Sequence, residues 1–239
     1  MQRLYVGTSG WAYPGWRAGF YPPDLPAGKF LPYYARRLPS VEVNYTFRHL
    51  PSAATVDGWI AETPPGFRFA IKAGQWLTHV KRLKDPAASL PRFLDAVQPL
   101  ADAGRRGPVL FQLPPDLRAD VPRLAAFLAA LPRGLAATFE FRHPSWFVDE
   151  VYATLHEVDA ALCVAEAEKL VTPDVATASF AYYRFRRPTY TEGEQREITA
   201  RLRAQLQAGR TVYAFFKHEE SAAGALCAEA VGRELADGA

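Results

Sequence analysis

The sequence predicts a single TIM-type (β/α)8 barrel over residues 1–239, with a long first βα loop and a shortened sixth βα unit. Eight short segments rich in Val, Phe, Tyr or Thr alternate with helical patterns, as parallel strands in βαβ units do. The length of 239 residues fits one closed barrel of about 250 residues. An open doubly wound sheet is the alternative, but neither GxGxxG nor GxxxxGKS/T supports it.

Glycine or proline bounds most of the expected elements. The expected strands are Leu4–Ser9, Val41–Thr46, Arg68–Ala73, Pro108–Leu113, Ala137–Arg142, Ala161–Ala165, Phe180–Arg186 and Thr211–Lys217. The expected helices are Leu90–Ala103, Val121–Leu131, Phe147–Val158, Glu192–Gln207 and Ala222–Leu235. Helix-capping patterns predict starts at Ser89, Asp120 and Thr191 and stops at Gly104, Gly134 and Gly209. The two irregular stretches are Gly10–Lys29, rich in Trp, Tyr, Gly and Pro, and Glu166–Ser179, which has little room for a helix.

Composition excludes several classes of protein. Two cysteines, Cys163 and Cys227, form no CxxC pair, so neither a disulfide framework nor a structural zinc site is predicted. No apolar run approaches the length of about 20 residues that spans a bilayer. The start, MQRLYVGTSGW, lacks the pattern of a secretory signal. We therefore expect a cytoplasmic protein with no membrane partner.

The alternation of side chains along each strand predicts which residues face the barrel interior. Each of five expected strands has an apolar row that suits the layer beneath the helices and a polar residue on the other face near its carboxyl end. Val41, Val43, Tyr45 and Phe47, for example, form the apolar row of the second strand. The polar residues expected to face inward are Glu42, Asn44, Thr46, Lys72, Gln112, Glu140, Arg142, Arg184 and Arg186, with Lys217 at the end of the last strand.

These inward residues predict a pocket for an anion at the carboxyl ends of the strands, where barrel active sites lie. Cations outnumber the two carboxylates, and arginine forks suit phosphate or carboxylate groups. Glu140 and Glu42 are the candidates for general acid–base catalysis, with ion pairing to the arginines as the alternative for each. Lys72 and His143, at strand ends, complete the candidate catalytic set. Candidate substrate-binding residues are Asn44, His79, Gln112, Arg142, Arg184, Arg186, Lys217, Trp11 and Trp146.

Aromatic residues gather in or near the loops expected at the mouth of the barrel. They are Trp11, Tyr13, Trp16, Phe20, Tyr21, Trp76 and Trp146. Such rings stack on a base or a sugar in some proteins and form an ordinary packed lid in others. Both interpretations are open at this point.

No metal site is predicted, because the chain has no HExxH motif and no closely spaced carboxylate–histidine cluster. A set built from Glu42, His79, Glu140, His143 and His218 is the one conceivable arrangement. No motif indicates a cofactor, so the cofactor is unknown from sequence, as is the oligomeric state.

Seven segments in order resemble the YecE-like family, domain-of-unknown-function family 72. They are GTSGW (7–11), FY (20–21), VEVNYTF (41–47), FRFAIKAGQWLTH (67–79), GPVLFQLPP (107–115), EFRHPSW (140–146) and VYAFFKHE (212–219). The resemblance runs from about Gly7 to about Leu235 and implies a TIM-barrel-like fold without a settled activity. A structural likeness of the family to endonuclease IV-type barrels implies nucleic-acid binding as one possibility.

The sequence departs from that family's pattern in two places. RFRRP at 184–188 stands where many members have RLHGR, so Arg186 replaces a histidine, and Lys217 and His218 stand where many members have paired asparagines. Both changes make the expected mouth more basic, and they weaken any mechanism that needs the missing histidine.

Two functions follow as hypotheses. The first is an enzyme, of hydrolase or lyase type, that holds a small phosphate- or carboxylate-bearing substrate with its arginines and moves a proton with Glu140 or Glu42. The alternative is a nucleic-acid-binding protein or nuclease-like barrel that uses the same cations and the aromatic loops. A two-carboxylate glycosidase fits less well, because the excess of cations does not suit a neutral sugar, and a non-catalytic scaffold is a further alternative.

Overall fold

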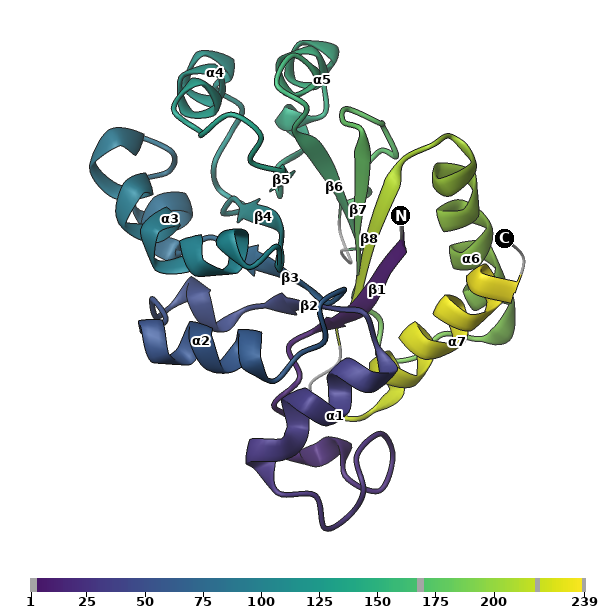
Figure 1. The fold of residues 1–239 in the computed structure, drawn as a ribbon. Coiled ribbons are helices and arrows are strands. Elements are labelled where there is room, and N and C mark those ends of the chain that lie inside the picture. The colour runs from purple at the N-terminus through teal and green to yellow at the C-terminus, as the bar shows by residue number, and fades with distance from the viewer. Residues whose placement is uncertain (1–3, 167–169, 218–219, 238–239) are drawn as a thin grey trace.

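The computed structural model describes residues 4–166, 170–217 and 220–237 (Figure 1). Eight parallel strands close into a barrel in chain order, with β1 paired to both β2 and β8, so the open-sheet alternative is excluded. The strands are β1 Leu4–Ser9, β2 Ser40–Val43, β3 Arg68–Lys72, β4 Arg106–Gln112, β5 Ala137–Glu140, β6 Ala161–Ala165, β7 Phe180–Phe185 and β8 Thr211–Phe216. Each expected strand is therefore present, with ends within three residues of the expected ones.

The helices surround the barrel (Figure 1). They are α1 Phe30–Arg37, α2 Ala53–Ala61, α3 Pro86–Asp102, α4 Val121–Ala129, α5 Asp149–His156, α6 Glu192–Gln207 and α7 Ala223–Asp237. Shorter helical turns lie at Pro14–Trp16, Ala27–Lys29, Tyr45–Phe47, Trp76–Val80 and Pro144–Trp146. Between β6 and β7 the described residues contain no helix, which confirms the shortened sixth unit. No helix of the described segments is long and apolar enough to cross a bilayer.

Local capping chemistry explains several of the helix ends. Thr191 and Glu194 form a reciprocal capping box at the start of α6. The Arg123 N–H donates to the Asp120 carboxylate at 3.0 Å at the start of α4. Gly104 and Gly209 adopt φ of +65° and +83° just beyond α3 and α6, the left-handed conformation that ends many helices.

Two of the expected helix ends are wrong. Helix α3 begins one turn before Ser89, because Pro86 occupies its first turn and needs no N–H donor there. Gly134, with φ of +77°, lies in the turn before β5, whereas α4 has already ended at Ala129.

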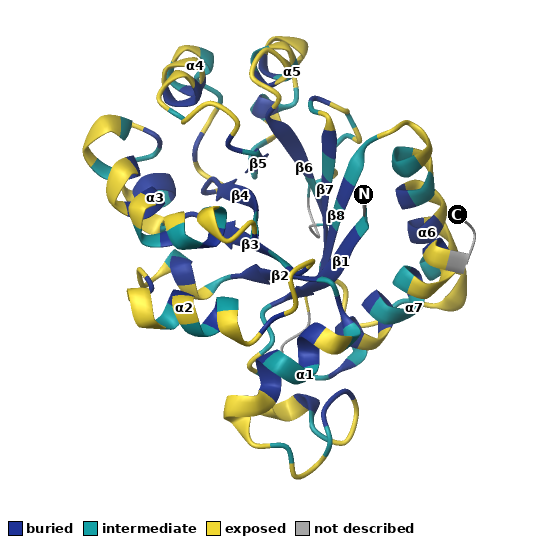
Figure 2. Ribbon diagram, in the orientation of Figure 1, coloured by how far each residue is buried: buried dark blue, intermediate teal, exposed yellow. Residues whose placement is uncertain are grey.

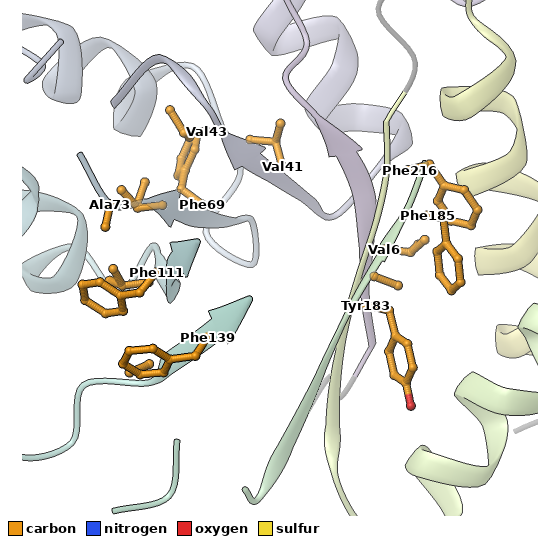
Figure 3. Close-up of a cluster of buried hydrophobic side chains, with 14 of the residues drawn as sticks. Val6, Val41, Val43, Phe69, Ala73, Phe111, Phe139, Tyr183, Phe185 and Phe216 are labelled. Atoms are coloured by element: carbon orange, nitrogen blue, oxygen red, sulfur yellow. The ribbon is translucent and has the colours of Figure 1, made fainter. Parts of the chain in front are cut away.

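The apolar face of each strand packs beneath the helices. Figure 3 shows part of this layer, which includes Val41, Phe69, Phe111, Phe139 and Phe216 from five different strands. All five of these residues are fully buried. Figure 2 shows the strands buried and the outer sides of the helices exposed. The expected apolar rows therefore do face the helices, and this leaves the opposite row to fill the barrel.

Strand β2 is shorter than expected, and this changes the position of two aromatic residues. The strand ends at Val43, and Tyr45–Phe47 form a helical turn. The Thr46 hydroxyl holds that turn by donating to the carbonyl oxygens of Val43 at 3.0 Å and Lys72 at 2.7 Å. The expectation that Tyr45 and Phe47 lie beneath the helices is therefore wrong, since Tyr45 is 52% exposed.

The long first loop packs beside α1. Trp16, Phe20 and Tyr21 are each at most 2% exposed, and Tyr21 stacks on Phe30 of α1 with ring centroids 4.3 Å apart. The Tyr21 hydroxyl donates to the Trp11 carbonyl at 2.6 Å. These contacts give the loop a packed core of its own, and its aromatic rings are used in that core.

Candidate anion-binding site

A cavity of about 430 Å³ lies at the carboxyl ends of the strands. This is the end at which barrel active sites are built. Its described lining comes from the ends of β2, β3, β4, β5, β7 and β8, and consists of Asn44, Tyr45, Phe47, Arg48, His49, Lys72, Gln112, Arg142, Arg184, Arg186 and Lys217. No residue of 10–29 is in this lining, so the first loop does not cover the cavity.

Below the cavity, an ion pair crosses the barrel interior. Arg184 Nη2 on β7 donates to Glu42 Oε1 on β2 at 2.7 Å, and these strands are not neighbours in the barrel. The hydroxyls of Ser9 and Tyr182 also donate to the Glu42 carboxylate, each at 2.8 Å. Glu42 is 0% exposed, and all of its contacts come from inward-facing residues. The alternation along the strands therefore predicted the facing of Glu42 and Arg184 correctly.

Glu140 is the second buried carboxylate and holds three guanidinium groups. Arg184 Nη1 donates to its Oε2, Arg186 Nη2 to its Oε1 at 2.8 Å, and Arg142 Nε to its Oε1 at 3.0 Å. The Gln112 amide donates to Oε2 at 2.9 Å. Glu140 is 2% exposed. It therefore lies under the cavity as an anchor for the arginines that line it.

The pKa values of both glutamates are lowered by these contacts. Burial alone would raise the pKa of Glu42, but the charge of Arg184 and its hydrogen bond outweigh burial. Burial would also raise the pKa of Glu140, and the charges of Arg184, Arg186 and Arg142 together reverse that effect. Both carboxyl groups are thus ionised near neutral pH. Of the two roles left open by the sequence, this geometry favours ion pairing and argues against proton transfer by either group.

The lowered pKa values predict how stability depends on pH. A carboxyl group with a folded-state pKa below its unfolded value stabilises the fold above the unfolded pKa and loses that effect as pH falls. We expect the free energy of unfolding to decline most steeply below about pH 5, where the carboxyl groups of the unfolded chain take up protons. Urea titrations at each pH measure this decline. It should be shallower in Glu140→Gln than in Glu192→Gln, whose carboxylate is 89% exposed, and equal slopes would contradict the assignment.

The arginines keep hydrogen-bond donors that no described residue uses. The Nε atoms of Arg184 and Arg186 are buried without a partner within the described chain. Arg142 uses only its Nε on Glu140 and is 32% exposed. Six cations line the cavity. The described side-chain ion pairs beneath them involve two carboxylates, Glu42 and Glu140, which three of those cations share.

Lys72 and His79 lie on one side of the cavity, next to Phe47. The Lys72 ammonium is 4.1 Å from the centroid of the Phe47 ring, and His79 meets the same ring edge-on at 5.0 Å. Burial, followed by the charge of Arg184, lowers the pKa of Lys72 to about 8. Burial, followed by the charge of Lys72, lowers the pKa of His79. Both side chains are therefore partly shielded bases near a cationic surface.

Of the other expected site residues, three lie outside the cavity lining. His143 caps the turn after β5, where its Nδ1 accepts the Ser145 N–H at 3.2 Å. Trp146 is 1% exposed, and its indole N–H donates to the Leu117 carbonyl at 2.8 Å. Trp11 packs edge-on against Trp59 at 5.9 Å. The two tryptophans therefore serve packing in this structure. Asn44, Gln112 and Lys217 do line the cavity.

The structure adds four residues to the lining that the strand pattern missed. They are Tyr45, Phe47, Arg48 and His49, which follow the early end of β2. The alternation rule stops where a strand stops, so it assigned the aromatic pair to the wrong face and left Arg48 out. The Asn at position 44, a residue that favours turns over strands, is the signal for the early end.

Within the described segments, no three His, Cys, Asp or Glu side chains are grouped so as to hold a metal ion. His218, which belonged to the one conceivable ligand set, lies outside the described residues. Arg184 donates hydrogen bonds to both glutamates, and the Arg186 side chain donates to Glu140. Two carboxylates engaged in this way are poor candidates for metal ligands.

A larger hollow, of about 900 Å³, lies at the opposite end of the barrel beside α1 and α7. Its lining is mostly apolar, with Leu4, Val6 and Phe67 from the amino ends of strands. Its best-formed polar feature is the Arg37–Glu229 ion pair at 2.5 Å. The smaller cavity is the better candidate site. Among the described residues, it gathers several convergent polar groups, and titratable groups with shifted pKa values lie in or beside its lining.

A closed barrel of eight parallel strands with a cationic pocket at their carboxyl ends defines this chain as a TIM-type barrel protein. The family model described as "Protein of unknown function DUF72" matches residues 5–238. The chain therefore belongs to the DUF72 family, which confirms the resemblance seen in its motifs.

Relatives and solved structures agree with this assignment. The chain is 30% identical to the UPF0759 protein YunF of Bacillus subtilis (strain 168) over 62% of this chain and 54% of that protein. It is 32% identical to the UPF0759 protein YecE of Escherichia coli (strain K12), over 60% of this chain and 50% of that protein. The chain thus spans about half the length of the curated relatives it matches.

Two crystal structures of DUF72 family proteins superpose on this fold. The protein from Thermotoga maritima MSB8 has a TM-score of 0.87 at 27% identity, over 98% of this chain and 100% of that one. The protein from Enterococcus faecalis V583 has a TM-score of 0.81 at 17% identity, over 99% and 98% of the two chains. At that lower identity the likeness speaks for the fold alone.

Proposed function

We propose that this protein binds a small molecule carrying a phosphate or carboxylate group in the cavity at the carboxyl ends of its strands. One observation carries the proposal. Six cations line that cavity, and no carboxylate is among its described lining residues. Their positive charges outnumber the two buried carboxylates, Glu42 and Glu140, with which three of them pair. Such charges held close together repel one another, and an anion relieves that repulsion. The ligand is therefore expected to be anionic.

The geometry of the guanidinium groups supports a planar or tetrahedral oxyanion. Arg142 and Arg186 are each anchored on Glu140 through one edge. This anchoring limits their rotamer freedom before a ligand arrives, which lowers the entropic cost of binding. Each keeps further N–H donors on the same rigid fork, and two parallel N–H donors match the oxygen spacing of a carboxylate or phosphate.

The size of the cavity supports a small ligand. A volume of about 430 Å³ falls at the lower end of the range of about 300–1,000 Å³ typical of small-molecule pockets. Glu42 and Glu140 take part in this proposal by orienting the arginines. Since both are already ionised and paired, an enzymatic reaction at this site would need another proton carrier. Lys72 in the cavity lining and His79, which packs against the lining residue Phe47, are the nearest titratable groups with shifted pKa values. A cytoplasmic location belongs to the same proposal and is supported by two buried, unpaired cysteines.

Isothermal titration of the protein with inorganic phosphate and with citrate at low ionic strength tests the proposal. We expect saturable binding, and we expect Arg142→Ala to bind about 10- to 100-fold more weakly, the usual loss when a charge-assisted hydrogen bond is removed. Glu140 keeps Arg184, Arg186 and Gln112 in that variant, so the network should survive. Far-UV circular dichroism and the melting temperature check this directly.

The matched control is Arg36→Ala, which removes an exposed arginine from the opposite end of the barrel. This variant loses the same formal charge, so it measures the effect of net charge alone. We expect its phosphate affinity to match that of the wild type. Equal weakening in both variants, or no saturable binding of either anion by the wild type, would show that the cavity is not the anion site.

Nucleic-acid binding is the second candidate, and exposed aromatic residues favour it. Tyr45, 52% exposed, lines the cationic cavity, and Trp76, 56% exposed, lines an adjoining hollow that shares Arg48 with it. Aromatic rings beside cations are typical of surfaces that stack bases. A single-stranded oligonucleotide should then bind with a steep loss of affinity as salt is added, because several phosphates release counterions. A shallow salt dependence together with phosphate binding would favour the small anion.

A further inference from the structure

Lys72 differs from Arg142, Arg184 and Arg186, three other cations of the cavity, in how it is held. It is the last residue of β3, and it lines the cavity from inside the barrel. The arginines beside it are anchored on buried glutamates at 2.7–3.0 Å. Lys72 makes no such ion pair within the described chain, and the partner found for its ammonium is the face of the Phe47 ring. A lysine in this position is held by packing and is available for chemistry.

The groups that face Lys72 come from several strands of the barrel and from the segments that follow them. Arg184 on β7 and Arg142 beyond β5 repel its positive charge, whereas Glu42 on β2 and Glu140 on β5 attract it. His79 lies close enough for the charge of Lys72 to lower its pKa. Lys217 lines the same cavity. Burial and Arg184 outweigh the two glutamates, because both carboxylates are already paired with arginine.

The consequence is a larger neutral fraction of the amine near neutral pH. The pKa of Lys72 falls from 10.5 to about 8. A shift of that size raises the neutral fraction at pH 7 by roughly 300-fold over an ordinary lysine. Desolvation beside another cation is a known way in which proteins turn a lysine into a nucleophile.

We propose that Lys72 is a nucleophile that forms an imine with the carbonyl group of a small anionic compound, such as an oxo acid or a phosphorylated aldehyde or ketone, held by the cavity arginines. This inference rests on the proposed function, since the guanidinium groups supply the hold on the anion. It adds to that function a reaction type, a reacting atom and a substrate class.

The chemistry is balanced without a further reagent. The nitrogen lone pair of the neutral amine attacks the carbonyl carbon, and the carbonyl electron pair moves to oxygen, which takes up a proton. The nitrogen loses a proton to give a neutral carbinolamine. The hydroxyl takes up a proton and leaves as water while the nitrogen lone pair forms the C=N bond, and loss of the remaining nitrogen proton then gives the imine and returns the proton that the hydroxyl took up. One amine and one carbonyl compound become one imine and one water, with no oxidation or reduction.

Pyridoxal 5′-phosphate is a suitable probe, because it joins an aldehyde to a phosphate. The protein is incubated with an equimolar amount at pH 7, and sodium borohydride then reduces any imine to a stable secondary amine. Peptide mass spectrometry measures labelling at each of the six lysines, which are Lys29, Lys72, Lys81, Lys84, Lys169 and Lys217. We expect at least about tenfold more label on Lys72 than on any other, a conservative fraction of the gain in neutral amine.

Two controls separate the amine from the anion site. Lys72→Arg keeps the positive charge and should lose the label, because a guanidinium group does not supply the neutral amine that forms the imine. Pyridoxal without its phosphate should label Lys72 at least about tenfold less, since it lacks the charge-assisted hydrogen bonds. Labelling at Lys72 should rise with pH through about 8.

Each outcome decides one of the two proposals. If phosphate binds but Lys72 is labelled no more than the exposed Lys29, the imine inference is overturned and the anion site stands. A label concentrated on Lys217 overturns the assignment to Lys72 in the same way. If neither phosphate nor pyridoxal 5′-phosphate binds in the cavity, the proposed function fails and the imine inference fails with it.

Discussion

Replacing Arg184 with alanine is expected to lower the free energy of unfolding by about 3–5 kcal/mol, the usual loss when one partner of a buried ion pair is removed. Arg184 is 2% exposed and contacts both Glu42 and Glu140. Without it, Glu42 keeps only two hydroxyl donors and becomes a buried charge with no counter-charge. A loss of this size should lower the melting temperature by roughly 6–20 °C for a chain of this length.

The matched control is Arg187→Ala, three residues further along the same segment. Arg187 is 53% exposed and pairs with Glu194 and Glu166 at the surface. Exposed pairs of this kind contribute about 1 kcal/mol or less. Urea denaturation compares the two variants. Adding Glu42→Gln to Arg184→Ala should recover part of the stability, because the penalty comes from the unpaired carboxylate. An Arg184→Ala variant as stable as Arg187→Ala would contradict the buried network.

Replacing Trp146 with alanine is expected to destabilise the protein by about 3–5 kcal/mol, the range for a large aromatic residue removed from a core. Trp146 is 1% exposed and stacks on Phe141 with centroids 4.4 Å apart. Its indole N–H satisfies the Leu117 carbonyl at 2.8 Å. Alanine would leave a cavity in place of the ring and an unpaired carbonyl beside it. Thermal and urea denaturation measure the loss.

Trp76→Ala is the matched control, since Trp76 is 56% exposed. Exposed substitutions of this kind usually change stability by less than about 1 kcal/mol. The same pair of variants also tests what each ring does for a ligand. The folded Trp146→Ala protein should bind phosphate as the wild type does, because Trp146 does not line the cavity. A large loss of phosphate affinity with unchanged stability would restore Trp146 to the ligand-contacting role expected from sequence.

The sequence predicted the fold and the inward residues well, because both depend on short-range patterns. The alternation of apolar and polar residues in a strand has a period of two, so it can be recognised from a few consecutive residues. It placed Glu42, Gln112, Glu140 and Arg184 on the inner face, and the hydrogen bonds across the barrel confirm those four placements. The order of strands and helices likewise indicated a closed barrel, which the β1–β8 pairing confirms.

The prediction failed where a local pattern met a contact from another element. The alternation in 41–47 continues into Tyr45 and Phe47, but the Thr46 hydroxyl bonds the Lys72 carbonyl and turns the chain into a helical turn. Nothing in 41–47 alone indicates that bond. The Trp residues near the mouth were equally ambiguous, because an aromatic ring suits a core and a ligand site alike.

By itself, the sequence determined that this protein is a parallel α/β barrel with an excess of cations among its inward side chains, since strand order and side-chain facing follow from local patterns. Only the tertiary structure decided how those charges are paired. Glu42 meets Arg184 across 142 positions of the chain, and Glu140 meets it across 44. Such pairings depend on how the barrel closes and on the register of strands that are not neighbours. That closure paired both glutamates with arginines and left Lys72, at the end of β3, beside an aromatic ring.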